Sequence, residues 1–177
     1  ARTPDVPRDR IEHVQLLRPS DAARFAWLGV VASIQPIHAA ADRDLVETAW
    51  AGRQDDAYAW RSLADAGALL AAGSDAPVES VNPWLGIFAA LHRRFPDDAR
   101  GDWRPAQALT FAEALSAYTR GPAVAIGAAD EGHLHVGARA DLAVLSVTLA
   151  ELQRGGEALA GVRSDMTIVG GREVHRS

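Results

Sequence analysis

The sequence predicts an α/β protein in which short parallel strands alternate with amphipathic helices. Three apolar runs, over residues 10–14, 30–35 and 68–72, have the length and composition of buried strands. Amphipathic stretches separate these runs, and such alternation is typical of βα units that build a parallel sheet. From about residue 128 onward, glycines punctuate short extended runs, so a separate region of short strands is expected there.

Local signals define the helices between the strands. Ser20 precedes an apolar stretch that Gly29 follows, which is the usual pattern of helix start and stop. Pro83 has the place of a first helical residue. Thr110 and Glu113 have the spacing of a capping box. The expected helices cover residues 21–28, 57–66, 84–95, 110–118 and 122–126.

Composition excludes several kinds of site. The 177 residues suffice for one domain with a real core, and the net charge of −5 comes without a basic cluster that would indicate nucleic-acid binding. Cysteine is absent, which excludes disulfides and thiolate chemistry. All 18 cationic side chains are arginine, so no lysine can form a Schiff base or a metal-bridging carbamate. Without a signal-peptide core or a membrane-length apolar run, we expect a cytoplasmic protein with no membrane partner.

Two polar residues stand at the ends of predicted strands. Asp75 follows the apolar run 68–72 in a Gly-Ser-Asp turn, and His13 follows the first run. In parallel α/β barrels the chemistry lies at this end of the strands, so a carboxylate and an imidazole there can meet at a metal ion. The alternatives are that Asp75 only organises a turn and that His13 is a surface or core residue.

Three further residues are candidates for substrate binding. His38 and Gln35 lie near the end of the middle strand, and Trp84 closely follows Asp75. Each has a structural alternative: a solvated loop histidine, a glutamine outside the pocket, and a tryptophan in the core or at an interface. Residues 42–44 are interpreted as a plain solvated loop.

The number of predicted strands bears on domain organisation. Three βα units cannot close an eight-stranded barrel, which takes about 250 residues. Either the sheet is open or the chain is the last part of a larger protein. Because the chain starts just before a strand, the second interpretation is favoured.

Six motifs occur in the order found in one known superfamily. The chain resembles the amidohydrolase superfamily, and within it the YtcJ-like branch that includes N-substituted formamide deformylases. The motifs are Arg10-Ile11-Glu12-His13, Ser33-Ile34-Gln35-Pro36-Ile37-His38, Gly73-Ser74-Asp75-Ala76-Pro77-Val78, Asn82-Pro83-Trp84-Leu85-Gly86-Ile87, the stretch 109–119, and the stretch 132–142.

This resemblance implies a fold and a set of site residues. Residues 1–127 would be the last βα units of a metal-dependent (β/α)8 barrel, strands six to eight, and residues 128–177 would be strands of a small β-sandwich. His13 would be a metal ligand, and Asp75 would bind the metal, which the resemblance implies to be zinc, or accept the proton of the attacking water. The family's ligands on its first, fourth and fifth strands are absent here. His133 and His135 are rejected as substitutes because they fall at the return strand of the sandwich.

The resulting functional prediction is the C-terminal portion of an amidohydrolase that hydrolyses an amide or related C–N bond. The expected partners are a small amide substrate and the missing N-terminal part of the barrel. Because zinc catalytic sites usually keep three protein ligands, the isolated chain is expected to be inactive. The first alternative is a non-catalytic half-barrel that associates with itself as a homodimer or with its missing half. The second, a metal-free hydrolase that uses Ser74, Asp75 and His13, is disfavoured because no nucleophile elbow is present.

Overall fold

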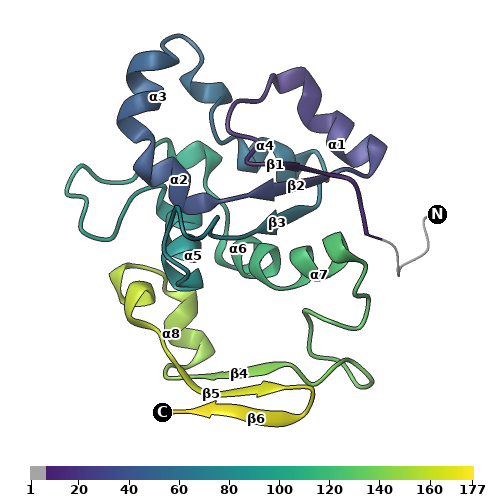
Figure 1. Cartoon of the computed structure of the whole chain (residues 1–177). Coiled ribbons are helices and arrows are strands. Elements are labelled where there is room, and N and C mark those ends of the chain that lie inside the picture. The colour runs from purple at the N-terminus through teal and green to yellow at the C-terminus, as the bar shows by residue number, and fades with distance from the viewer. Residues whose placement is uncertain (1–6) are drawn as a thin grey trace.

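The computed structural model describes residues 7–177 and contains two small sheets with helices packed around the first (Figure 1). The first sheet is formed by β1 (Arg10–Glu12), β2 (Val31–Ile34) and β3 (Leu70–Ala72), and the second by β4 (Leu142–Leu145), β5 (Ser164–Val169) and β6 (Arg172–Arg176). The α-helices are α1 (Ala22–Leu28), α2 (Pro36–Ala41), α3 (Arg43–Ala49), α4 (Trp60–Asp65), α5 (Pro83–His92), α6 (Phe111–Tyr118), α7 (Arg120–Ile126) and α8 (Leu149–Gln153). Short 3-10 turns are η1 (Pro19–Asp21), η2 (Gln54–Asp56), η3 (Pro105–Gln107) and η4 (Glu157–Gly161).

The first sheet is parallel and has the order β1-β2-β3, which confirms the α/β class. Glu12 pairs with Ser33, and Ile34 pairs with Ala72, so the three strands end at the same edge. Each strand is only three or four residues long and is followed closely by a loop or a helix. Whatever follows the strands is therefore brought together at that edge.

Strands β2 and β3 are buried between helices on both faces, whereas β1 is exposed. Ile34 and Leu70 point into the main core with residues of α1, α4 and α5, while Val31 and Ala71 pack on the other face against Ala125 of α7. Gly121, at the start of α7, lies so close to β3 that an added Cβ would sit 2.0 Å from the Leu70 carbonyl oxygen. At β2 and β3 the sheet therefore has the two covered faces typical of parallel α/β folds.

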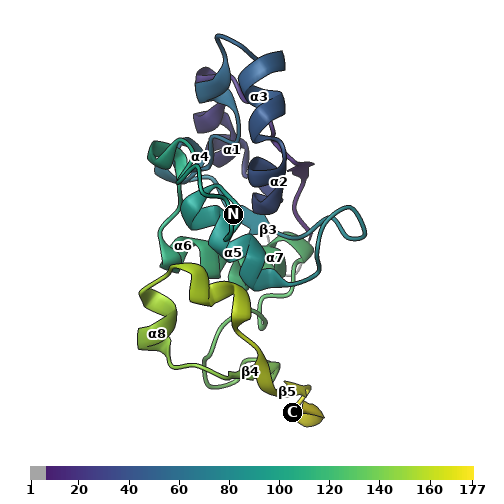
Figure 2. The same cartoon turned by 90° about the vertical axis from the view of Figure 1, so that its left-hand side faces the viewer.

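The C-terminal part forms an antiparallel sheet beside the α/β part (Figures 1 and 2). Gly170 and Gly171 connect β5 to β6, as a two-residue hairpin signal predicts, and both have positive φ. The turn η4 packs against α5 and so joins this region to the first. Residues 128–177 also contain the helix α8, which begins with a capping box formed by Thr148 and Glu151.

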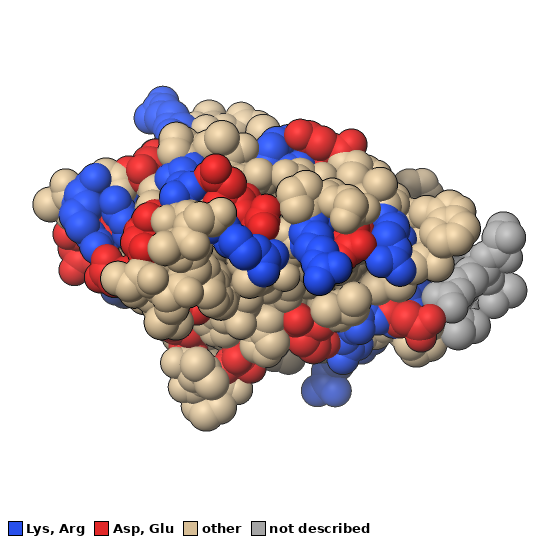
Figure 3. Space-filling view, turned by 90° about the horizontal axis from the view of Figure 1, so that it is seen from above, with Lys and Arg blue, Asp and Glu red and all other residues tan. Residues whose placement is uncertain are grey.

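One local prediction was wrong. Residues 42–44 are not a solvated loop, because Asp42 joins α2 to α3 and the other two residues begin α3. The face seen from above α1 and α3 carries arginine and carboxylate side chains next to one another (Figure 3).

No helix within residues 7–177 has both the length and the apolar character needed to cross a bilayer.

Candidate metal centre

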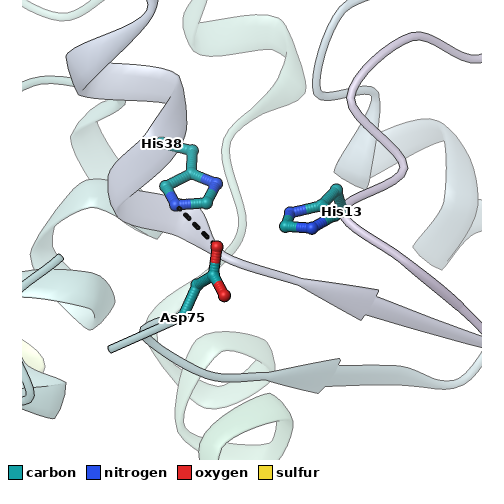
Figure 4. Close-up of side chains that lie close together, drawn as sticks. All are labelled: His13, His38 and Asp75. Atoms are coloured by element: carbon teal, nitrogen blue, oxygen red, sulfur yellow. Dashed lines mark ion pairs between the residues drawn. The ribbon is translucent and has the colours of Figure 1, made fainter. Parts of the chain in front are cut away.

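Three potential metal ligands meet at the edge where the parallel strands end. His13, His38 and Asp75 each offer one ligand atom, and these three atoms lie within 4.8 Å of one another (Figure 4). His13 follows β1, His38 lies on the helix that follows β2, and Asp75 follows β3. The fold thus brings together residues that are 25 and 37 positions apart in the sequence. Among the described residues this is the group of histidines and carboxylates with the spacing of a metal site.

The two imidazoles lie nearly parallel, and the carboxylate faces one of them. The ring centroids of His13 and His38 are 5.6 Å apart, with 16° between the ring planes. His38 Nε2 lies 3.8 Å from Asp75 Oδ2, which is an ion-pair separation but too long for a hydrogen bond. His38 is 8% exposed, whereas the Asp75 side chain is 39% exposed. The centre is therefore closed on the His38 side and reaches solvent at Asp75.

Two of these residues have an unusual backbone conformation. His13 has φ 69°, Val14 after it has φ 48°, and Asp75 has φ 59°. Left-handed conformations of non-glycine residues cost roughly 1–3 kcal/mol each, and they persist only where the surroundings impose them. Histidine and aspartate tolerate this region better than most residues, whereas β-branched Val14 does not. The strain is located where the two strands present their functional side chains.

One ring nitrogen of each histidine is buried without a hydrogen-bond partner among the described residues. His13 Nδ1 and His38 Nε2 are both buried and form no hydrogen bond within residues 7–177. A buried polar atom without a partner costs about 1–3 kcal/mol, which a bound cation would remove. Histidine nitrogen and carboxylate oxygen bind zinc at about 2.0–2.2 Å, so two ligands of one tetrahedral ion lie about 3.3–3.6 Å apart. The three donor atoms lie within 4.8 Å of one another, so they would have to move about 1 Å closer around an ion. The donor types, two imidazoles and a carboxylate, are those that bind zinc.

Two possibilities were given for His38, contact with substrate and a solvated loop position. Contact with substrate stays a prediction. The alternative of a solvated loop histidine is wrong, because His38 is buried on α2. Two local signals could have shown this: Pro36 at the first helical position, and the apolar residues Ile37, Ala39 and Ala40 around His38. Its closeness to His13 could not be predicted from these signals.

The other candidate residues lie in different surroundings. Gln35 precedes α2 and is 7% exposed, and its Oε1 has no hydrogen-bond partner in the described part of the chain. Trp84 is buried in the main core on the first turn of α5, as expected of a core tryptophan. Contact of Gln35 or Trp84 with substrate stays a prediction. His133 and His135 were expected at the return strand, but they lie in an exposed loop before β4, with ring centroids 6.2 Å apart.

Sequence reasoning missed a polar cluster, two members of which lie within four residues of His13 or His38 in the sequence. Gln15, Asp42 and Tyr58 form hydrogen bonds with one another, and Tyr58 is 1% exposed. Burial, and then the hydrogen bond to Asp42, raise the pKa of Tyr58 well above its usual range, so that its hydroxyl stays protonated. No sequence motif marks these three residues.

Comparison with solved structures defines the class of fold. The chain is similar to an uncharacterized metal-dependent hydrolase from Pyrococcus furiosus, with 33% identity, a TM-score of 0.60, and coverage of 71% of this chain and 25% of that one. It also superposes, with a TM-score of 0.65, on a mutant of the atrazine chlorohydrolase TrzN from Arthrobacter aurescens TC1 in complex with zinc and atraton. That match covers 94% of this chain and 36% of the other at 22% identity, and so concerns the fold alone.

Sequence comparison identifies the family. Residues 1–175 match the profile of the amidohydrolase family, and the chain belongs to that family. Protein LONG AFTER FAR-RED 3 of Arabidopsis thaliana is 39% identical over 142 residues, and putative amidohydrolase YtcJ of Bacillus subtilis is 33% identical over 141 residues. Each match covers 78% of this chain, and 24% and 27% of the relatives, so the chain spans about a quarter of their length. The predicted resemblance to the YtcJ-like branch is confirmed.

Proposed function

We propose that this chain is the C-terminal part of a metal-dependent hydrolase that cleaves an amide or related C–N bond. The observation that carries the proposal is the convergence of His13, His38 and Asp75 at the shared edge of three parallel strands. Membership of the amidohydrolase family supports hydrolysis, and N-substituted formamide deformylase of Arthrobacter pascens, 31% identical over 140 residues, supports a C–N bond as the target. In this proposal β1, β2 and β3 are strands six to eight of a (β/α)8 barrel, with residues 128–177 in a β-sandwich.

Each of the three residues has a stated role. His13 and His38 hold the metal through one ring nitrogen each, and Asp75 is its third protein ligand. When bound, a divalent metal, zinc in the first instance, polarises the scissile carbonyl and makes water more acidic. Asp75, the more exposed of the three, accepts a proton from the attacking water and returns it to the leaving nitrogen. The left-handed backbone at Asp75 directs the carboxylate toward His38 and toward solvent.

His38 adds a donor that the sequence-based set of His13 and Asp75 did not contain. Catalytic zinc sites usually have three protein ligands, a number that this chain reaches only with His38. The family's ligands on other barrel strands lie outside this chain. We therefore expect weak metal binding by residues 1–177 alone, and turnover only in the full-length protein.

Metal binding by the full-length protein tests the proposal. Zinc content and affinity would be measured for wild type, His13→Ala and Asp75→Asn, with the exposed His135→Ala as the control. Asparagine keeps the left-handed backbone at position 75, so this variant removes the charge without changing the fold. We expect Asp75→Asn to lower kcat on an N-acyl amine by about 10²-fold or more. Wild-type zinc affinity in His13→Ala, or wild-type rates in Asp75→Asn, would refute the proposal.

A non-catalytic half-barrel that associates with another chain is the second candidate. β1 and β3 each have one strand partner among the described residues, and unpaired strand edges promote association. A hollow of about 300 Å³ beside β1 is lined by apolar side chains that include Ile11, Phe25 and Leu28. Sedimentation of residues 1–177 would test it: a dimer without bound zinc supports the half-barrel, and a monomer that binds zinc supports the hydrolase.

A further inference from the structure

A part-buried hydrogen-bond network connects the two segments that carry the histidines. The Tyr58 hydroxyl donates to Asp42 Oδ2, and Gln15 Nε2 donates to the Tyr58 hydroxyl oxygen at 3.0 Å and to Asp42 Oδ2 at 3.3 Å. The Tyr58 hydroxyl is thus both donor and acceptor, and the carboxylate receives two donors. The network is closed on itself and specifies one arrangement of its three members.

The network joins the chain just after His13. Gln15 lies two residues beyond His13, and its backbone oxygen accepts a hydrogen bond of 2.9 Å from the Tyr58 backbone nitrogen. Leu16 and Ala57 form an antiparallel bridge next to this bond. Tyr58 therefore fixes the segment that follows the left-handed turn at His13. A left-handed backbone at a non-glycine residue persists only where the surrounding structure imposes it.

The same network joins the helix that carries His38. Asp42 ends α2, and its backbone nitrogen donates to the His38 backbone oxygen at 2.8 Å. Asp42 also begins α3, so a displacement of its side chain would move the last turn of α2. One tyrosine hydroxyl is consequently bonded to the residue that caps the His38 helix and contacts the side chain that follows the His13 turn.

We propose that Tyr58, together with Gln15 and Asp42, is a positioning residue that sets the separation of the His13 and His38 imidazoles. This inference rests on the proposed function, because the separation matters only if both rings hold one metal. Tyr58 itself does not belong to the group of ligand atoms. Its role would be to keep the two rings 5.6 Å apart before the metal binds, so that little reorganisation is needed.

Cobalt binding to the full-length protein distinguishes this role from plain core packing. Co²⁺ affinity and its visible absorption would be measured for wild type, Tyr58→Phe, Asp42→Ala and Asp42→Asn. Removing a residue that orients metal ligands typically lowers metal affinity 10–100-fold, and we expect about tenfold for Tyr58→Phe, with an altered absorption spectrum. Asp42→Ala should resemble Tyr58→Phe, whereas Asp42→Asn keeps an acceptor for the hydroxyl and should keep most of the affinity.

The matched control is Ser62→Ala, with melting temperatures recorded for every metal-free variant. Ser62 accepts a part-buried hydrogen bond of 2.8 Å from Gln107, outside the network. Weaker Co²⁺ binding in Tyr58→Phe but not in Ser62→Ala supports the inference. Wild-type Co²⁺ affinity in Tyr58→Phe would overturn it. So would a loss of Co²⁺ affinity that is proportional to the fall in melting temperature and is the same in Tyr58→Phe and Ser62→Ala. If His13→Ala also binds Co²⁺ like wild type, the proposed function itself has failed; if only His13→Ala loses affinity, the metal centre stands and the positioning role does not.

Discussion

Replacing Arg93 by methionine tests the most unusual interaction in the core. Arg93 is fully buried, and its guanidinium donates to three backbone oxygens, those of Ala57 (3.2 Å), Tyr58 (2.8 Å) and Trp103 (3.1 Å). It also lies between two indole rings, 4.7 Å from the centroid of Trp60 and 4.9 Å from that of Trp103. Burial lowers the pKa of Arg93 to about 9, which leaves it charged at neutral pH.

The structure sets the size of the expected effect. Each carbonyl left without a donor costs about 1–3 kcal/mol, and the contacts with the indoles add about 0.5–2 kcal/mol each. The desolvation of a buried cation, several kcal/mol, is relieved at the same time. We therefore expect Arg93→Met to lower the free energy of unfolding by about 3 kcal/mol. For a chain of this size that corresponds to a fall in melting temperature of roughly 6–12 °C.

Urea unfolding followed by tryptophan fluorescence measures this effect directly, because Trp60 and Trp103 flank the mutated side chain. The control is Arg100→Met, since the Arg100 side chain is 49% exposed and pairs with Asp44 and Asp98. Exposed pairs contribute about 0–1 kcal/mol, so the control should change little. A loss below about 1 kcal/mol in Arg93→Met would show that the three carbonyls do not depend on this cation.

Three further measurements test the packing, the electrostatics and the metal. Gly121→Ala should lower stability by about 1–3 kcal/mol, because its Cβ would meet the Leu70 carbonyl oxygen at 2.0 Å; Gly161→Ala, in open space, is the control, and equal losses would contradict the packing argument. The Arg61 hydrogen bond holds the pKa of Glu113 near 2, below its ordinary 4.5, so its stabilisation is complete above pH 4.5 and is lost as the pH falls toward 2. Glu113→Gln should flatten the stability curve in that window, and an unchanged curve would exclude this carboxylate as its source. Removing the metal from the full-length protein with a chelator should lower the melting temperature, and zinc should restore it, because a ligand of the native state alone stabilises it; a melting temperature that does not respond would argue against a resident metal.

Elements with local signals could be predicted from the sequence. The capping box at Thr110 and Glu113 begins α6, Pro83 begins α5, and Gly170 lies in the β5–β6 hairpin. The strands were found because their apolar runs end at polar residues, and Asp75 was identified by the same signal. These features depend on a few neighbouring residues, which the sequence shows directly.

Features that depend on distant residues could not be predicted. The approach of the His38 ring to the His13 ring joins residues 25 positions apart, and no local signal extends that far. Asp42 bonds to Gln15 across 27 positions and to Tyr58 across 16, and no local pattern encodes such pairings. The assignment of the strands as six to eight of a barrel stays a prediction, because it depends on chain outside residues 7–177.

The register of the parallel sheet has a consequence for how this protein tolerates change. His13 and Asp75 reach the same point only because β1, β2 and β3 stop in line, with Glu12 opposite Ser33 and Ile34 opposite Ala72. Adding or deleting one residue inside a strand would turn every later side chain of that strand to the opposite face. Evolution and engineering must therefore keep the lengths of these three strands if the two side chains are to meet.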